Sequence, residues 1–425
     1  MEQLINLTDS IFLGHFSPID LGASALAAMY YSAIHILGFG FSLGAQVVIA
    51  RRSGEGAYAA TGKIFYQALI FLSAFSVFIF IGSQVFTPLL LRGIISSDPV
   101  YEAVIHYMQW RDYSFLFAFP LLAIRAFLIG ILNTRILTAN SIVTVACNIL
   151  FDYLLIFGKA GFPRLGISGA AIGSSLAGGV GLLFLTVYMA RYINKQQYGI
   201  HFTFDWKLSL HLLSVSSWTM IRSFFCIAPW FLFFVAIEHL GECELAAANV
   251  VRSISMLFFV IVNSFSTTAI SLVSTLIGAG KTAEVMPACR RVIRLNYAVG
   301  LPLLVLALIC SDSVLKLFTD DTNVIATAFY PFGVMLSTFV LSVPAYTYCN
   351  AVIGTGNTKI AFLFQLINIT VYLSYLFLLS RSPDIPLAAY WTAEQLYVLV
   401  LWGLSCTYLK KWRKIHQSDL QILRV

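Results

Sequence analysis

The sequence predicts an all-α, polytopic membrane protein of 12 transmembrane helices in two parallel six-helix repeats, with a short or truncated first helix. Three observations support this fold class. Of the 425 residues, 59% are hydrophobic and only 11% are charged, which leaves too little polar surface for a soluble protein of this size. Long apolar runs alternate with short clusters of Gly, Pro, Asn and charged residues. One pattern of turn residues also occurs twice, once in each half of the chain.

Eleven apolar runs are long enough to cross a bilayer, because about 20 helical residues span the hydrocarbon core. A twelfth segment, residues 1–16, is polar at its start and reaches only about 24 Å at 1.5 Å per residue. It is therefore marginal as a span. The eleven full runs cover residues 24–50, 62–91, 102–131, 136–157, 166–193, 208–239, 244–277, 286–317, 324–354, 360–380 and 386–409.

The basic residues predict the orientation of these spans. If the 12 segments alternate and the tail is cytoplasmic, most of the 26 Lys and Arg residues fall on the cytoplasmic side, as is usual for membrane proteins. Both termini are then cytoplasmic, and the net charge of +7 reflects topology and predicts no nucleic-acid partner. The outer side carries Arg92, Lys159, Arg164, Lys316 and Arg381.

The repeated pattern predicts a duplicated half. Pro120–Gly130 is followed by Asn133, Thr134 and Arg135, and Pro344–Gly354 is followed by Asn357, Thr358 and Lys359. Because each half carries an even number of spans, the copies enter the membrane from the same side, with a site between them. The predicted parts are lobes at residues 1–193 and 208–409, a cytoplasmic linker at 194–207 and a basic cytoplasmic tail at 410–425.

An ionisable residue, Asp152, lies in the otherwise lipid-compatible run from Ala146 to Gly158. Burying a charge in hydrocarbon costs several kcal/mol, so an intramembrane acid indicates a functional site by default. Asn148 lies one helical turn earlier, where its amide could hydrogen-bond the carboxyl group or share a bound cation with it. The alternative is a structural polar patch that holds two helices together.

Two further polar residues lie at a similar estimated depth in the first half. Asp9 and Ser174 are each about 12 Å from the outer end of their spans, and Asp152 is about 9 Å from the end of its own. With Asn148 they predict an oxygen-rich cluster that could hold a proton between two carboxyl groups or a Na⁺ ion among four oxygen ligands. The seven cysteines have no metal-ligand spacing, so we predict no other metal site and no cofactor.

The second half lacks an acid at the position equivalent to Asp152, which is Leu376. Its clear intramembrane acid is Glu394, and Arg252 lies at about the same depth. Two interpretations stay open here, a structural ion pair between Arg252 and Glu394 or a second coupling or substrate site. Other polar groups inside spans are interpreted as structural hydrogen-bonding groups, namely His35, Arg125 and Arg222.

Several segments together resemble the multidrug and toxic compound extrusion (MATE) transporters of bacterial type. They are TDSIFLGH around Asp9, NILFDYLLIFG around Asp152, GISGAAIGSS, LGECELAAANVVRS and the paired GxxNT(R/K) loops. The resemblance implies two six-helix lobes around a central cleft and the exchange of Na⁺ or H⁺ for amphipathic organic cations. It also implies that Asp9, Asn148, Asp152 and Ser174 form the cation or proton network.

Two departures from the family pattern refine this resemblance. One branch of the family has acidic residues in its carboxy-terminal lobe, and this chain has Cys226 and Ser342 at those positions. Arg222 instead resembles the pattern of the branch related to DNA-damage-inducible transporters. Members of the family also have a longer segment before this point, so we expect that Met1 is an internal methionine and that the chain is truncated.

These observations predict a secondary antiporter, not an enzyme, that exports amphipathic cationic drugs or metabolites in exchange for H⁺ or Na⁺ by alternating access. We expect a small-molecule organic substrate, a surrounding lipid bilayer and a monomer in the bacterial cytoplasmic membrane. The alternative is a flippase or exporter of a lipid-linked or polyprenyl substrate. A membrane-embedded transferase is disfavoured because the sequence has no acidic metal-binding motif. A channel is disfavoured because the sequence has no repeated selectivity-filter segment.

Overall fold

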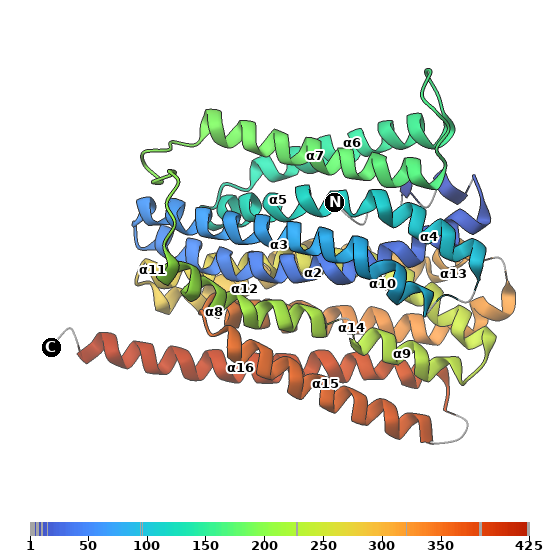
Figure 1. Ribbon diagram of the computed structural model, residues 1–425. Coiled ribbons are helices and arrows are strands. Elements are labelled where there is room, and N and C mark those ends of the chain that lie inside the picture. The colour runs from blue at the N-terminus through green and yellow to red at the C-terminus, as the bar shows by residue number, and fades with distance from the viewer. Residues whose placement is uncertain are drawn as a thin grey trace. The chain divides into compact units, whose positions relative to one another are not determined.

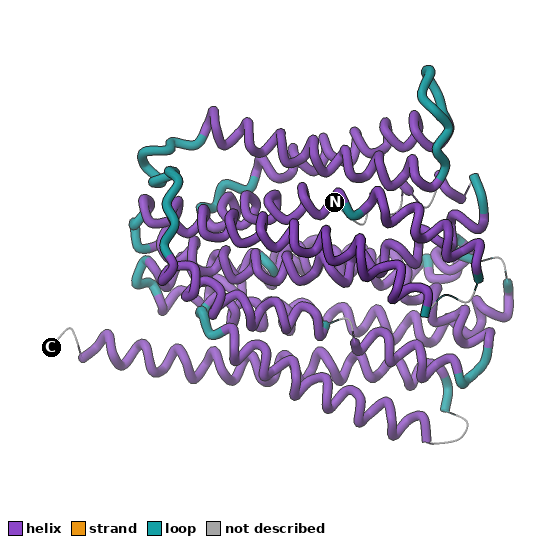
Figure 2. Tube along the Cα trace, viewed as in Figure 1, coloured by secondary structure: helices purple, strands orange, loops and turns teal. Residues whose placement is uncertain are grey.

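The computed structural model describes residues 5, 8–9, 12–14, 16–93, 95, 97–226, 228–319, 321–381 and 385–422. These residues form helices and no strand (Figure 1, Figure 2). The predicted first span, residues 1–16, and the end of the basic tail fall largely outside the described residues.

The helices follow one another with short connections. Their bounds are α2 (Pro18–Gly54), α3 (Tyr58–Arg92), α4 (Asp98–Arg111), α5 (Tyr113–Gly130), α6 (Arg135–Phe157), α7 (Ile167–Tyr192), α8 (Trp206–Phe225), α9 (Ala228–Glu238), α10 (Glu242–Ser266), α11 (Thr268–Gly278), η1 (Thr282–Glu284), α12 (Val285–Ile309), α13 (Ser311–Lys316), α14 (Thr322–Gly354), α15 (Thr358–Arg381) and α16 (Leu387–Ile422).

Nine helical segments of the described chain are long and apolar enough to cross a membrane. The predicted all-α, multi-pass class is confirmed, and the count of 12 stays a prediction. Some predicted spans consist of two helices. The run at 102–131 forms α4 and α5, which meet at Asp112, and the run at 208–239 forms α8 and α9.

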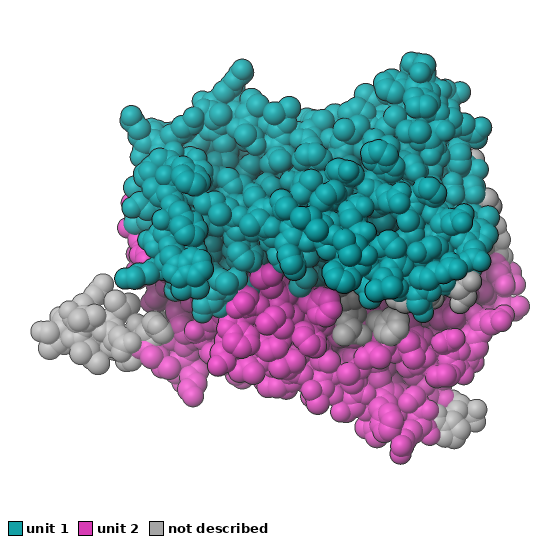
Figure 3. All heavy atoms as spheres, viewed as in Figure 1, with its two compact units in different colours: residues 1–49, 57–216 teal, residues 50–56, 217–425 magenta. Residues whose placement is uncertain are grey.

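The chain divides into two compact units, coloured separately in Figure 3. Unit 1 comprises residues 1–49 and 57–216, and unit 2 comprises residues 50–56 and 217–425. The predicted linker, residues 194–207, is mostly loop and turn, whereas the division between the units falls within α8. The symmetry relation between two lobes stays a prediction.

In unit 1, α6 packs along α7, and glycine makes this approach possible. A Cβ atom on Gly169 would lie 2.7 Å from the backbone carbonyl of Leu155, which is closer than real Cβ atoms come. A Cβ atom on Gly173 would collide with Oδ1 of Asp152. The two glycines are one helical turn apart, the small-xxx-small spacing that allows close packing of membrane helices. This packing places the buried acid of α6 directly against α7.

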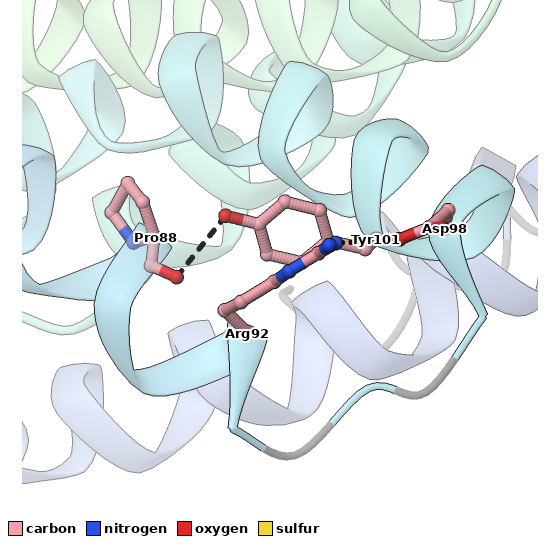
Figure 4. Close-up of polar contacts among 4 residues, drawn as sticks. All are labelled: Pro88, Arg92, Asp98 and Tyr101. Atoms are coloured by element: carbon pink, nitrogen blue, oxygen red, sulfur yellow. Dashed lines mark hydrogen bonds and ion pairs between the residues drawn. The ribbon is translucent and has the colours of Figure 1, made fainter.

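The corner between α3 and α4 shows how two neighbouring helices of unit 1 are joined (Figure 4). Nη1 of Arg92 lies 2.6 Å from Oδ1 of Asp98, and the guanidinium group lies 5.0 Å from the centre of the Tyr101 ring. The Tyr101 hydroxyl donates a hydrogen bond to the Pro88 carbonyl at 3.1 Å. Both ion-pair partners are exposed, so this pair contributes about 1 kcal/mol or less.

In unit 2, α14 is the central helix and packs against α10, α12, α15 and α16. Its first turn is capped by Asp321, whose carboxylate accepts hydrogen bonds from the backbone N–H groups of Asn323 and Val324. The core around it combines aliphatic and aromatic side chains, among them Phe332 and Trp391, which are each 1% exposed. Glu394, the acid predicted in the second half, lies on α16 and lines a cavity together with Trp391 of this core.

Candidate ion-coupling site

The structure brings the four predicted side chains of the first half together in unit 1. Asp9 comes from the amino-terminal segment, Asn148 and Asp152 from α6, and Ser174 from α7. All four are buried, since none is more than 3% exposed. Side chains whose estimated depths are similar thus lie close together, and their role in ion coupling stays a prediction.

Asp9 is the common acceptor of this cluster. The Ser174 hydroxyl lies 3.0 Å from Oδ2 and 3.3 Å from Oδ1 of Asp9. The Asn148 amide donates to the Ser174 oxygen at 3.2 Å and to Oδ1 of Asp9 at 3.5 Å. Two donors from α6 and α7 therefore converge on one carboxylate.

Sequence reasoning missed one member of the cluster, Tyr107. Its side chain comes from α4, is 1% exposed, and its hydroxyl donates to Oδ2 of Asp9 at 3.2 Å. No sequence signal distinguishes it, because the chain contains 20 tyrosines. On the same helix, Arg111 is buried and close enough to interact electrostatically with Asp152. Its guanidinium group lies 4.4 Å from the centre of the Tyr31 ring.

Asp152 differs from Asp9 in lacking hydrogen-bond donors. Both of its carboxylate oxygens are buried and receive no hydrogen bond from the described residues. The side-chain oxygen of Asn148 is likewise buried and has no hydrogen-bond partner among them. The two carboxyl groups are close enough to interact electrostatically. Unsatisfied buried acceptors cost free energy, so a cation or a proton at these atoms would stabilise the cluster.

The donor set fits both coupling ions that were predicted. A proton would neutralise one carboxyl group and link it to the other. A Na⁺ ion would find carboxylate, amide and hydroxyl oxygens, the ligand type that hard cations prefer. Within the described part of the chain, no group of three or more His, Cys, Asp or Glu residues could hold a transition metal.

The acid of unit 2 does not form the predicted ion pair. Oε1 of Glu394 accepts a hydrogen bond from the Tyr372 hydroxyl at 2.7 Å. The guanidinium group of Arg252 instead lies 5.1 Å from the centre of the Phe234 ring, and its Nε has no acceptor in the described part of the chain. The ion-pair interpretation is therefore wrong, because similar depth does not make two side chains face each other.

The other polar residues inside the spans have separate surroundings. Nη2 of Arg222 lies 3.2 Å from Sγ of Cys349, and the His35 ring stacks 5.9 Å from that of Tyr31. The Ser342 hydroxyl donates to the Phe339 carbonyl of its own helix. The hydrogen bond of the Ser342 hydroxyl is therefore made within its own helix.

Comparison with known proteins identifies the family. A family model described as MatE matches residues 1–154 and 212–400, which is most of the chain. The protein belongs to the MATE family. The family resemblance predicted from the sequence is confirmed, and the assignment to one branch stays a prediction. The chain is thus a member of a family of multi-pass membrane transporters and not of enzymes.

Individual relatives have low sequence identity to this chain, and a solved structure has a similar fold. A probable multidrug resistance protein NorM from Thermotoga maritima is 25% identical over 360 residues, covering 84% of this chain and 77% of the relative. A NorM from Rhizobium meliloti is 25% identical over 61% of this chain and 56% of the relative. The solved outward-facing structure of a multidrug resistance MATE transporter has a TM-score of 0.90 at 18% identity, covering 98% and 93% of the two chains.

Proposed function

We propose that this MATE protein is a secondary active antiporter that exports amphipathic, cationic drugs or metabolites in exchange for H⁺ or Na⁺. It works by alternating access in the bacterial cytoplasmic membrane, with both termini in the cytoplasm. The observation that carries the proposal is the buried cluster of Asp9 and Asp152. The names of the NorM relatives support drug export as the activity.

The cluster suits ion coupling because its charge is incompletely compensated. Asp9 receives three side-chain donors, from Tyr107, Asn148 and Ser174, whereas Asp152 receives none from the residues that the structure describes. A bound proton or Na⁺ would remove most of the penalty for holding two acids in one apolar layer. Binding and release of that ion therefore change the free energy of the protein by an amount that can drive a conformational exchange.

The test uses purified protein in proteoliposomes loaded with a fluorescent organic cation such as ethidium. A pH gradient is imposed at equal Na⁺, and a Na⁺ gradient at equal pH, so that the driving ion is identified directly. Asp9→Asn and Asp152→Asn should each abolish gradient-driven transport, because the amide keeps the shape but neither titrates nor carries charge.

The matched control is Asp98→Asn, which removes an acid from the same unit at an exposed position outside the cluster. This variant should transport like the wild-type protein. Full gradient-driven transport by Asp152→Asn would overturn the proposal. Movement of a lipid-linked substrate, with no response to organic cations, would favour the flippase alternative instead.

A further inference from the structure

Unit 2 contains a partly open cavity of about 110 Å³ that differs in chemistry from the cluster of unit 1. Its walls come from α9, α10, α14 and α16, and they are mainly aromatic and aliphatic. Its lining includes Trp230, Phe258, Phe259, Tyr346, Trp391 and Glu394. Among the described residues that line the cavity, Glu394 is the only charged one.

Hydrogen bonds hold Glu394 in place at this wall. Tyr372, which is fully buried on α15, donates its hydroxyl to Oε1 of Glu394. The Tyr372 ring packs edge-on against Tyr397 at 5.7 Å, and the Tyr397 hydroxyl is bonded in turn to Gln365 at 2.8 Å. The carboxylate is thus positioned by a connected set of buried side chains, and a fixed orientation is what a binding site requires.

Glu394 has no cationic partner among the described residues. Arg252 lies against Phe234, and the described contact of Arg222 is with Cys349. Glu394 is partly buried, and a partly desolvated carboxylate without a counter-charge is unfavourable, so a cation supplied by a ligand would stabilise it.

The aromatic walls select the kind of cation. Trp230 and Trp391 meet at 6.3 Å, and Phe259 and Tyr346 at 5.6 Å, so several ring systems border the same space. Aromatic faces attract cations, tryptophan most strongly, and they recognise quaternary ammonium groups in particular. A hard inorganic ion needs several oxygen ligands, whereas the Ser255, Thr338 and Ser342 hydroxyls at this wall each donate to a backbone carbonyl of their own helix. The cavity corresponds to the space of about three to four water molecules, which suits a small alkylammonium group.

We propose that this cavity binds the quaternary or alkylated ammonium head of the transported organic cation, with Glu394 as its counter-charge. The inference rests on the proposed function and assigns the charged end of the substrate to unit 2. The apolar remainder of an amphipathic substrate lies outside the cavity, because the volume admits only the head.

The probe is choline, compared with its neutral isostere 3,3-dimethylbutan-1-ol, in calorimetric titrations of the purified full-length protein. The wild-type protein should bind choline and bind the isostere at least about tenfold more weakly, since shape is shared and charge is not. Glu394→Gln should lower choline affinity by a similar factor and leave the isostere unaffected.

Two further variants test the aromatic wall without disturbing the core. Phe259 is 41% exposed, so its replacement is compatible with folding. Phe259→Leu should weaken choline binding several-fold, and Phe259→Tyr should retain it, because the tyrosine ring keeps an aromatic face. The control Glu242→Gln removes an exposed acid of α10 outside the cavity and should bind choline normally.

Ethidium transport measured on the same preparations separates this inference from the proposed function. Asp152→Asn should lose coupled transport and keep choline binding. Equal choline binding by the wild-type protein and Glu394→Gln, with coupled transport intact, overturns the cavity assignment alone. Glu394-dependent choline binding without any gradient-driven transport would refute the antiporter proposal and support the site.

Discussion

The substitution Gly173→Ala offers a sharp test of the packing that positions the acid of α6. The added Cβ atom would collide with Oδ1 of Asp152 and would lie 3.2 Å from its backbone nitrogen and 3.3 Å from Cβ of Phe151. Either the carboxylate leaves its position or α7 moves away from α6. Overpacking of this kind costs about 1–3 kcal/mol.

The matched control is Gly178→Ala on the same helix, because a Cβ atom there would meet nothing within 4 Å. Both variants gain the same helix propensity, roughly 1 kcal/mol in water, so their difference isolates the collision. The difference in stability should therefore be about 1–3 kcal/mol in favour of Gly178→Ala.

The assay combines thermal unfolding of the purified proteins with gradient-driven ethidium transport in proteoliposomes. Gly173→Ala should have the lower Tm, and its coupled transport should fall strongly, because the displaced carboxylate no longer faces Asp9. Gly178→Ala should match the wild-type protein in transport. Equal Tm values for the two variants, together with full coupling in Gly173→Ala, would refute the argument that α7 positions Asp152.

Three further substitutions each remove the hydrogen bonds of one side chain. Tyr107→Phe removes one donor to Asp9 and should lower stability by about 1 kcal/mol and reduce coupled transport only partly, as measured by Tm and by dye efflux. Tyr372→Phe frees Glu394 and should weaken choline binding a few-fold in calorimetry without changing ion coupling. Asp321→Ala removes the cap of α14 and should cost about 1 kcal/mol, seen as a lower Tm with transport unchanged.

The four predicted cluster residues could be found from the sequence because charge inside an apolar run is costly and therefore conspicuous. Asp152 interrupts such a run, and counting along the spans placed Asp9 and Ser174 at its depth. Gly169 and Gly173 could also be found, because their small-xxx-small spacing predicts close packing of helices. Tyr107 could not be found in this way. The chain has 20 tyrosines, so this residue type marks no particular position.

The failed pairing of Arg252 with Glu394 shows the limit of the depth estimate. Depth along a helix follows from 1.5 Å per residue, but the direction of a side chain around the helix axis depends on packing partners. Arg252 faces Phe234 on α9, and Glu394 faces Tyr372 on α15. The apolar pattern of the sequence does not predict which helices pack against each other, so it could not predict these partners.

Helix interruptions were missed for a related reason. Apolar runs indicate which residues suit the lipid environment, and both sides of an interruption are equally apolar. The break at Thr267 between α10 and α11 therefore lies inside one predicted run, and so does Asp112 between α4 and α5. The apolar pattern thus predicts that each segment is helical and apolar, but it does not predict where a helix is interrupted.

The two acidic sites carry the same kind of charge, and their neighbours determine which cation suits each. Around Asp9 and Asp152 the neighbours are amide, hydroxyl and phenol groups, whose oxygens can share a proton or coordinate a small hard ion. Around Glu394 they are indole, phenyl and phenol rings, whose faces suit a large, weakly hydrated organic cation. An antiporter must bind its driving ion and its cationic substrate without confusing them, and surroundings of different polarity supply that discrimination through the affinity difference between the two ligands.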